Sequence, residues 1–73
     1  MELKATQKVV LKVLVDNEGK WFNCNEIYNI CKVNRSHINS AIKFFVDNDY
    51  VYMPNSDGKV TVSPDGISAY YSS

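Results

Sequence analysis

The sequence predicts an α+β domain with three helices, a two-stranded β-hairpin and a short C-terminal helix, in that order. Apolar residues recur at helical spacing between residues 3 and 47, and the period changes to two between residues 50 and 62. The pair Asp57-Gly58, which favours a tight left-handed turn, separates the two runs of period two. One domain spanning residues 1–73 accounts for all of these segments.

The composition indicates one small domain. The chain has 73 residues, of which 45% are hydrophobic and 12% aromatic, enough for a single core. No uncharged run approaches the ~20 residues that span a bilayer, and no leader pattern opens the chain, so we expect a cytoplasmic protein without membrane contact. The formal net charge is zero, which argues against coating nucleic acid by charge alone but not against specific binding.

Residues 3–16 are predicted to form the first helix, or a shorter helix that starts later with Thr6 as its N-cap. Four apolar residues can share its buried face: Leu3, Val10, Leu11 and Leu14. Lysines recur every four residues, which is typical of a solvated stripe: Lys4, Lys8 and Lys12. Asn17-Glu18-Gly19 is expected to end the helix, because glycine adopts the left-handed conformation easily.

The segment from Lys20 to Phe22 is expected to be extended and to bridge to a second helix, with Trp21 and Phe22 in the core. Asn23 and Glu26 have the spacing of a capping box, which predicts a helix over residues 24–31. Its buried face should hold Ile27, Ile30 and Cys31. Cys24 and Cys31 are too far apart on a helix for a disulfide and lack the partners of a zinc site, so we interpret both as reduced core residues.

Residues 33–51 are predicted to form a turn, a third helix capped by Asn34 and the start of a strand. Ile38, Ala41, Ile42 and Phe45 lie at helical spacing and form one apolar stripe. The other positions from residue 34 to residue 43 carry hydrogen-bonding side chains. A helix that buries one side and offers donors and acceptors on the other suits the major groove of DNA.

The hairpin is predicted from strands 50–53 and 59–62 around the turn 54–58. Ser63 then has the character of an N-cap and Pro64 of a first helical residue, so a short helix should follow, with Ile67, Tyr70 and Tyr71 on its apolar face. Spacing across all elements predicts the core residues: Leu11, Leu14, Trp21, Ile27, Ile30, Val33, Ile38, Ile42, Phe45, Val51 and Val62.

The stretch from residue 32 to residue 43 contains Lys32, Arg35, His37 and Lys43 but no carboxylate. Arginine can pair bidentately with guanine, and asparagine, here Asn39, can do the same with adenine. Backbone N–H groups at the start of this third helix offer a further place for a phosphate.

This order of elements resembles the winged helix-turn-helix domain of small prokaryotic and viral transcription regulators. The run Val33 to Val51 resembles the family's recognition helix leading into its first wing strand, and Val60-Thr-Val-Ser-Pro-Asp-Gly66 is similar to the end of the wing in MarR-like proteins. The resemblance implies DNA contacts from the third helix and from the wing. Carried over by position, the DNA-binding residues are Arg35, Ser36, His37, Asn39, Ser40, Lys43, Asn55 and Lys59.

Catalytic and metal sites are not expected. His37 has no second ligand at a useful spacing, and Asp47 and Asp49 lack the glycine and glutamate of a calcium loop. Ser36, Ser40 and His37 lie on a solvated helix face with no orienting acid, so no nucleophile and base are predicted. We therefore expect a non-enzyme without cofactors.

A second set of residues is either packed beneath the wing or exposed as a dimer interface: Phe44, Val46, Tyr70 and Tyr71. Phe44 and Val46 are apolar where the resembled family usually has charged, exposed residues. The first functional hypothesis is a sequence-specific double-stranded DNA-binding protein, a transcription regulator acting as a homodimer. The alternative is a protein-interaction module on the same fold, for example a viral protein that binds a host factor and no DNA.

Overall fold

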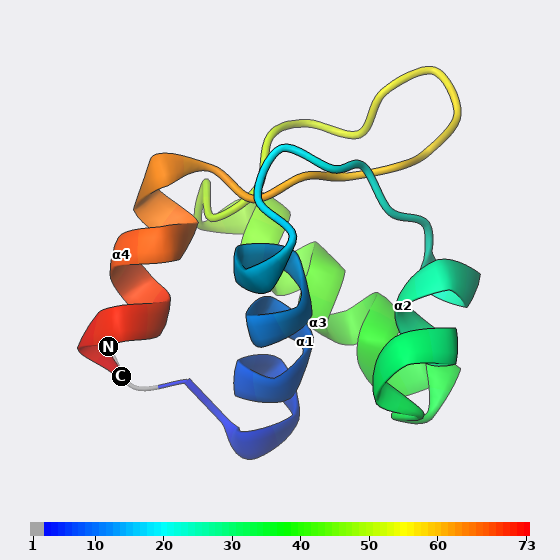
Figure 1. The fold of residues 1–73 in the computed structure, drawn as a ribbon, viewed down its shortest axis with the longest axis horizontal. Coiled ribbons are helices and arrows are strands. Elements are labelled where there is room, and N and C mark those ends of the chain that lie inside the picture. The colour runs from blue at the N-terminus through cyan, green and yellow to red at the C-terminus, as the bar shows by residue number, and fades with distance from the viewer. Residues whose placement is uncertain (1–2) are drawn as a thin grey trace.

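The computed structural model describes residues 3–73, and this part of the chain contains four α-helices (Figure 1). They are α1 (Ala5–Asp16), α2 (Cys24–Cys31), α3 (Arg35–Asp47) and α4 (Pro64–Ser72). Helix α1 contacts each of the other three, and α2 also packs on α3. None of the described helices is long and apolar enough to cross a membrane.

The predicted helix caps are confirmed. Asn23 Oδ1 accepts a hydrogen bond from the Glu26 N–H at 2.8 Å, and the Glu26 carboxylate accepts from the Asn23 N–H at 2.9 Å. Asn34 Oδ1 accepts from the Ser36 N–H at 2.8 Å, and Ser63 Oγ accepts from the Gly66 N–H at 3.2 Å. These bonds satisfy backbone donors that a helix start leaves unpaired, which is why local sequence predicts α2, α3 and α4 well.

The first helix is shorter than the sequence suggests. It begins at Ala5 instead of residue 3, with Lys4 as the N-cap and its N–H donating to Gln7 Oε1 at 2.9 Å. Leu3 is nevertheless buried, in an extended segment before the helix. Gly19 has φ +88, so the predicted left-handed glycine after this helix is confirmed.

The predicted two-stranded β-hairpin wing is wrong. The described residues contain two isolated bridges, Phe22 with Val60 and Val51 with Val62, and no strand, so the fold is mostly helical and not the expected α+β. Residues 50–63 instead form a long loop, called the 50–63 loop below, which extends beyond the helices (Figure 1).

Pro54 explains the missing hairpin. The bond from Tyr52 N–H to Thr61 O at 3.0 Å sets a register in which residue 54 would donate next to Lys59, but Pro54 has no N–H. Asn55 N–H donates to Lys59 O instead, at 3.0 Å. Val60 exchanges both of its backbone hydrogen bonds with Phe22, at 2.8 and 2.9 Å, on the side of the loop that faces away from residues 50–53.

The core lies between α1, α2, α3 and the base of the 50–63 loop. Of the predicted core residues, Leu11, Leu14, Ile27, Ile38, Phe45, Val51 and Val62 are buried. Val33 and Ile42 are half-buried and pack against this core. Trp21 and Ile30 were predicted wrongly, because they are 37% and 54% exposed.

Trp21 is exposed because successive side chains of an extended segment point to opposite sides. Phe22 pairs with Val60 and is only 2% exposed, so the preceding side chain in this extended segment points to the other side. Helix α2 is short and buries Ile27 fully, whereas Ile30, one turn further along, has no covering element.

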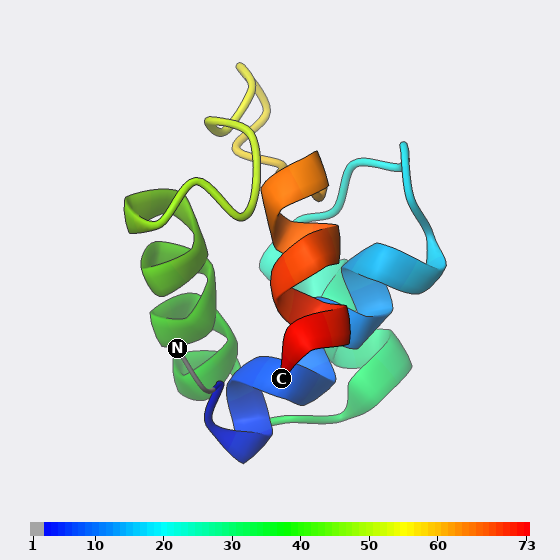
Figure 2. The same cartoon turned by 90° about the vertical axis from the view of Figure 1, so that its left-hand side faces the viewer.

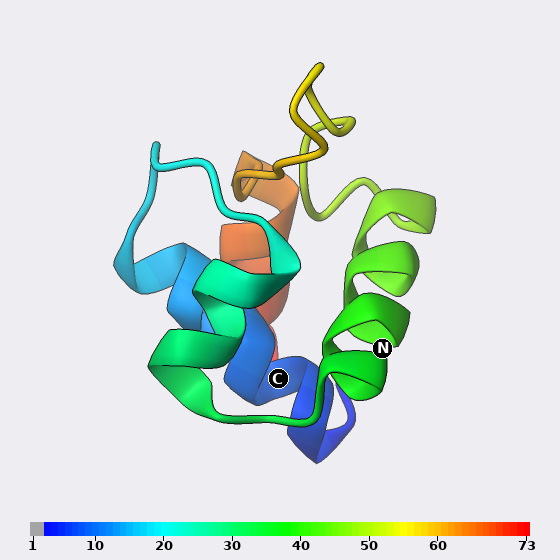
Figure 3. The same ribbon diagram turned by 90° about the vertical axis from the view of Figure 1, so that its right-hand side faces the viewer.

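Figures 2 and 3 show α3 at the edge of the molecule, which leaves one long side of this helix facing solvent.

Candidate nucleic-acid interface

The open side of α3 carries every residue predicted to contact DNA from this helix. All six are exposed: Arg35, Ser36, His37, Asn39, Ser40 and Lys43. On the opposite side Ile38, Ala41 and Phe45 are buried, at 0%, 2% and 0% exposed. Helix α3 therefore has one apolar face against the core and one polar, acid-free face in solvent over residues 35–43.

The start of α3 has little free capacity for a phosphate. Asn34 already accepts from three of its backbone N–H groups, Ser36 on the side chain and His37 and Ile38 on the carbonyl. Ser36 Oγ also donates to Asn34 Oδ1, at 2.7 Å. A phosphate at this end would have to bind mainly through side chains.

Arg35, the first residue of α3, is held by α2. Its Nε donates to Asn25 Oδ1 at 2.9 Å, and its guanidinium carbon lies 4.1 Å from the centroid of the Tyr28 ring. The Lys32 ammonium lies over the same ring, 5.4 Å from its centroid. Sequence reasoning missed Asn25 and Tyr28, because these contacts cross the turn between two helices and leave no periodic signal.

Lys43 and Asp47 form an exposed pair with Nζ and Oδ2 3.4 Å apart, one turn apart on α3. Both side chains are well exposed, 79% and 60%, so the pair contributes little stability and Lys43 can still exchange Asp47 for another anion. The same local arrangement occurs on α1 between Lys12 and Asp16.

The two loop residues predicted to touch DNA lie away from the start of α3. Figure 3 shows the 50–63 loop beyond the C-terminal end of α3, whereas Arg35 is the first residue of that helix. Asn55 Oδ1 accepts from the N–H groups of Asp57 and Lys59, at 2.9 and 3.0 Å, and so shapes the loop tip. Lys59 Nζ lies 3.4 Å from Glu26 Oε1, which joins the loop to the cap of α2.

Glu26 provides a pH-dependent test of this link. The hydrogen bond from the Asn23 N–H, and secondarily the Lys59 ammonium, hold the pKa of Glu26 below its ordinary value of 4.5. A carboxyl whose folded pKa is depressed stabilises the fold above its unfolded pKa and loses that contribution as pH falls through the folded value. We expect the melting temperature of the wild type to exceed that of Glu26→Gln at neutral pH, and this difference to shrink below pH 4.5.

Glutamine is the matched control in this measurement, since its side-chain oxygen still accepts from the Asn23 N–H but does not titrate. The melting temperatures of both proteins would be measured across the acid range by circular dichroism. A difference that stays constant or grows on acidification would contradict the assignment.

The four predicted interface residues differ in exposure. Phe44 and Val46 are half-buried and pack against the core, and the Phe44 ring meets those of Phe45 and Tyr50 edge-on, with centroids 6.2 and 6.1 Å apart. Tyr70 is also half-buried, whereas Tyr71 is 73% exposed. Of the four, Tyr71 offers the largest free surface to a second molecule.

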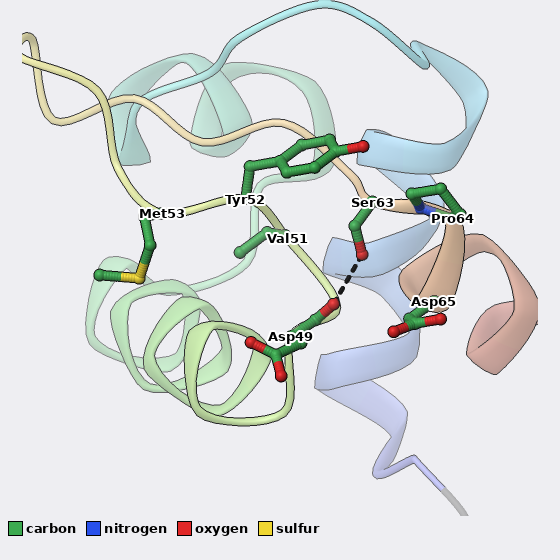
Figure 4. Close-up of a pocket in the computed structure, with 7 residues that line it drawn as sticks. All are labelled: Asp49, Val51, Tyr52, Met53, Ser63, Pro64 and Asp65. Atoms are coloured by element: carbon green, nitrogen blue, oxygen red, sulfur yellow. Dashed lines mark hydrogen bonds between the residues drawn. The ribbon is translucent and has the colours of Figure 1, made fainter.

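A cleft of about 370 Å³ lies where α3 ends and α4 begins (Figure 4). Its lining residues are Asp49, Val51, Tyr52, Met53, Ser63, Pro64 and Asp65. Ser63 Oγ donates to the Asp49 carbonyl at 2.6 Å and joins the two sides. The cleft lies outside the open face of α3, and the described residues contain no group of three potential metal ligands.

The fold has a counterpart among solved structures. It is similar to Bordetella bronchiseptica BpsR, whose DNA binding is regulated by 6-hydroxynicotinic acid, with a TM-score of 0.82 and 20% sequence identity. The match covers 96% of this chain and 51% of that one, so the chain spans about half the length of BpsR. No family model and no curated protein matches the sequence. The helices described above therefore have the fold of part of the BpsR chain.

Proposed function

We propose that this chain is a sequence-specific double-stranded DNA-binding protein that regulates transcription and places α3 in the major groove. The observation that carries the proposal is the open face of α3, where six hydrogen-bonding side chains are exposed and no acid occurs between residues 32 and 43. The likeness to part of BpsR supports it at the level of the fold. A relation to MarR-like regulators is part of this proposal, and it is based on the sequence from Val60 to Gly66, in which Ser63 is the N-cap of α4.

Each residue has a role suited to its chemistry. Arg35 retains its two terminal nitrogens for the O6 and N7 atoms of guanine, and Asn39 can pair with adenine. Lys43 would exchange Asp47 for a phosphate. Ser36, His37 and Ser40 would donate or accept along the groove, and Asn55 and Lys59 would contact the backbone from the loop.

Because one small domain covers few base pairs, we propose that two copies bind as a homodimer. Tyr71 and Tyr70 on α4, together with Phe44 and Val46 on α3, are the proposed contacts between copies. The binding site would then be an inverted repeat with half-sites about 10 base pairs apart.

Selection from a random pool of duplex DNA at low salt tests the proposal. With the enriched sequence, Arg35→Ala should cost about 1–3 kcal/mol and relax the preference at one base pair. Lys43→Ala should instead weaken all sequences alike and reduce the salt slope of log K by about one. Lys12→Ala is the matched control, since it removes a lysine from the same kind of i,i+4 pair on α1.

An enriched inverted repeat whose binding depends on Arg35 supports the function. A pool that enriches no sequence contradicts it. Equal losses from Lys43→Ala and Lys12→Ala would contradict the specific role of α3.

A protein-interaction module remains the second candidate. It is favoured by the zero net charge and by large apolar side chains that the described surface exposes: Val9, Trp21, Ile30, Tyr52, Met53 and Tyr71. Exposed apolar side chains are more typical of protein contacts than of DNA contacts. If selection fails, pull-down with the wild type against Arg35→Ala would test whether the face of α3 binds a protein.

A further inference from the structure

We propose that Asn25 and Tyr28 of α2 are positioning residues that fix the guanidinium of Arg35 for reading one guanine. The inference rests on the proposed function and adds to it the residues that set specificity. Neither α2 residue is expected to touch the base itself. Both act through Arg35, which belongs to the next helix.

Two contacts of different kinds define the orientation of the guanidinium. The bond from Arg35 Nε to Asn25 Oδ1, at 2.9 Å, directs one edge of the planar group towards α2. The Tyr28 ring, 4.1 Å from the guanidinium carbon, restricts tilt of that plane. Together they restrain an exposed side chain that otherwise samples many rotamers.

The edge left free by these contacts has the donors that guanine requires. With Nε engaged, the two terminal nitrogens of Arg35 still carry four N–H groups, and two parallel ones match guanine O6 and N7. The bidentate geometry is selective only when the plane of the guanidinium is aligned with that of the base pair, so restraining the plane before binding favours recognition.

The backbone of Arg35 is held as well. Asn34 caps α3 directly before Arg35. The Arg35 carbonyl accepts a weak hydrogen bond from Cys24 Sγ at 3.8 Å. Lys32 has a left-handed backbone with φ 58 at the end of α2 and makes the sharp turn that brings Arg35 back onto α2. The position and the orientation of the side chain are therefore both set by the junction of α2 and α3.

A purely structural role would link α2 to α3 without affecting sequence preference, so base discrimination is the decisive measurement. The experiment compares binding to the selected duplex with binding to the same duplex carrying A·T at the position that Arg35→Ala relaxes. Asn25→Ala should lower this discrimination roughly fivefold or more, with affinity for the altered duplex changed less than about twofold.

Matched variants separate the effect of the Tyr28 ring from that of its hydroxyl. They also separate the contacts with Arg35 from a general effect of substituting a residue on α2. Tyr28→Phe keeps the ring and should keep the discrimination, whereas Tyr28→Leu removes the ring and should lose it. Asn29→Ala, an exposed asparagine one turn further along α2, should leave discrimination unchanged. Tyr28 is half-buried, so Asn25→Ala, at an exposed position, decides the matter if Tyr28→Leu does not fold.

The outcomes are distinct. Lower discrimination in Asn25→Ala together with normal discrimination in Asn29→Ala supports the inference. Wild-type discrimination in Asn25→Ala, or an equal loss on both duplexes, overturns it while the DNA-binding function stands. A wild-type protein that selects no sequence overturns both.

Discussion

Phe45→Ala is expected to lower the free energy of unfolding of the domain by about 3–5 kcal/mol. Phe45 is 0% exposed, and its ring packs near those of Phe44 and Tyr50, with centroids 6.2 and 6.4 Å away. Removing a buried phenylalanine ring costs about 3–5 kcal/mol, because apolar contacts are lost and a cavity remains. For 73 residues the whole stability is of the order of 4–11 kcal/mol, so this loss is a large fraction of it.

Urea unfolding followed by circular dichroism measures this loss. Tyr71→Ala is the matched control, since it also truncates an aromatic ring but at a side chain that is 73% exposed. We expect the control to unfold close to the wild type. A loss of less than about 1 kcal/mol in Phe45→Ala would contradict the packing of α3 on the core.

Gly66→Ala is expected to destabilise the domain although alanine normally stabilises a helix by about 1 kcal/mol relative to glycine. Gly66 is buried in the first turn of α4, where the backbone of Tyr50 passes directly against it. A Cβ at this position would overlap the Tyr50 carbonyl oxygen and lie 2.9 Å from Val62 Cγ2. The neighbour is backbone that already accepts from the Ser63 N–H, so it cannot move aside cheaply.

Overpacking of this kind costs about 1–3 kcal/mol, which reverses the sign expected from helix propensity. Ser68→Ala, at an exposed position two residues further along α4, is the control and should be neutral or slightly stabilising. Thermal unfolding of the two variants beside the wild type gives the comparison. A Gly66→Ala protein as stable as the control would show that α4 does not approach the loop this closely.

Local signals predicted the helices, because helix ends are decided within a few residues. The capping pairs around Asn23, Asn34 and Ser63 are all visible in the sequence and all present in the structure. The hairpin prediction failed because hydrogen bonding across the loop stops after the bond from Tyr52 to Thr61, where Pro54 has no N–H to donate to Lys59. The register that places Pro54 at this rung is not readable from the sequence.

In the core, too, local sequence predicted the positions within helices but not those decided by pairing between distant segments. Periodicity identified Ile38 and Phe45 on α3, where the helix repeat fixes which side is buried. It did not decide between Trp21 and Phe22, since two adjacent aromatics in an extended segment point to opposite sides and only the pairing with Val60 selects one.

In the candidate site, the exposure of the polar face of α3 follows from that same repeat, and it was predicted. The pair of Lys43 with Asp47 is readable from their spacing of four residues. The contacts of Arg35 with Asn25 and Tyr28, and that of Lys59 with Glu26, are not readable, because they form only when separate elements meet.

The most direct test of the central claim is to observe which residues respond to DNA. Backbone amide chemical shifts of isotope-labelled protein would be recorded by NMR during titration with the selected duplex. We expect the largest changes along the exposed face of α3, from Arg35 to Lys43, with small changes along α1. Changes confined to α1 and α4, or no change at saturating duplex, would contradict the assignment of α3 as the DNA-binding element.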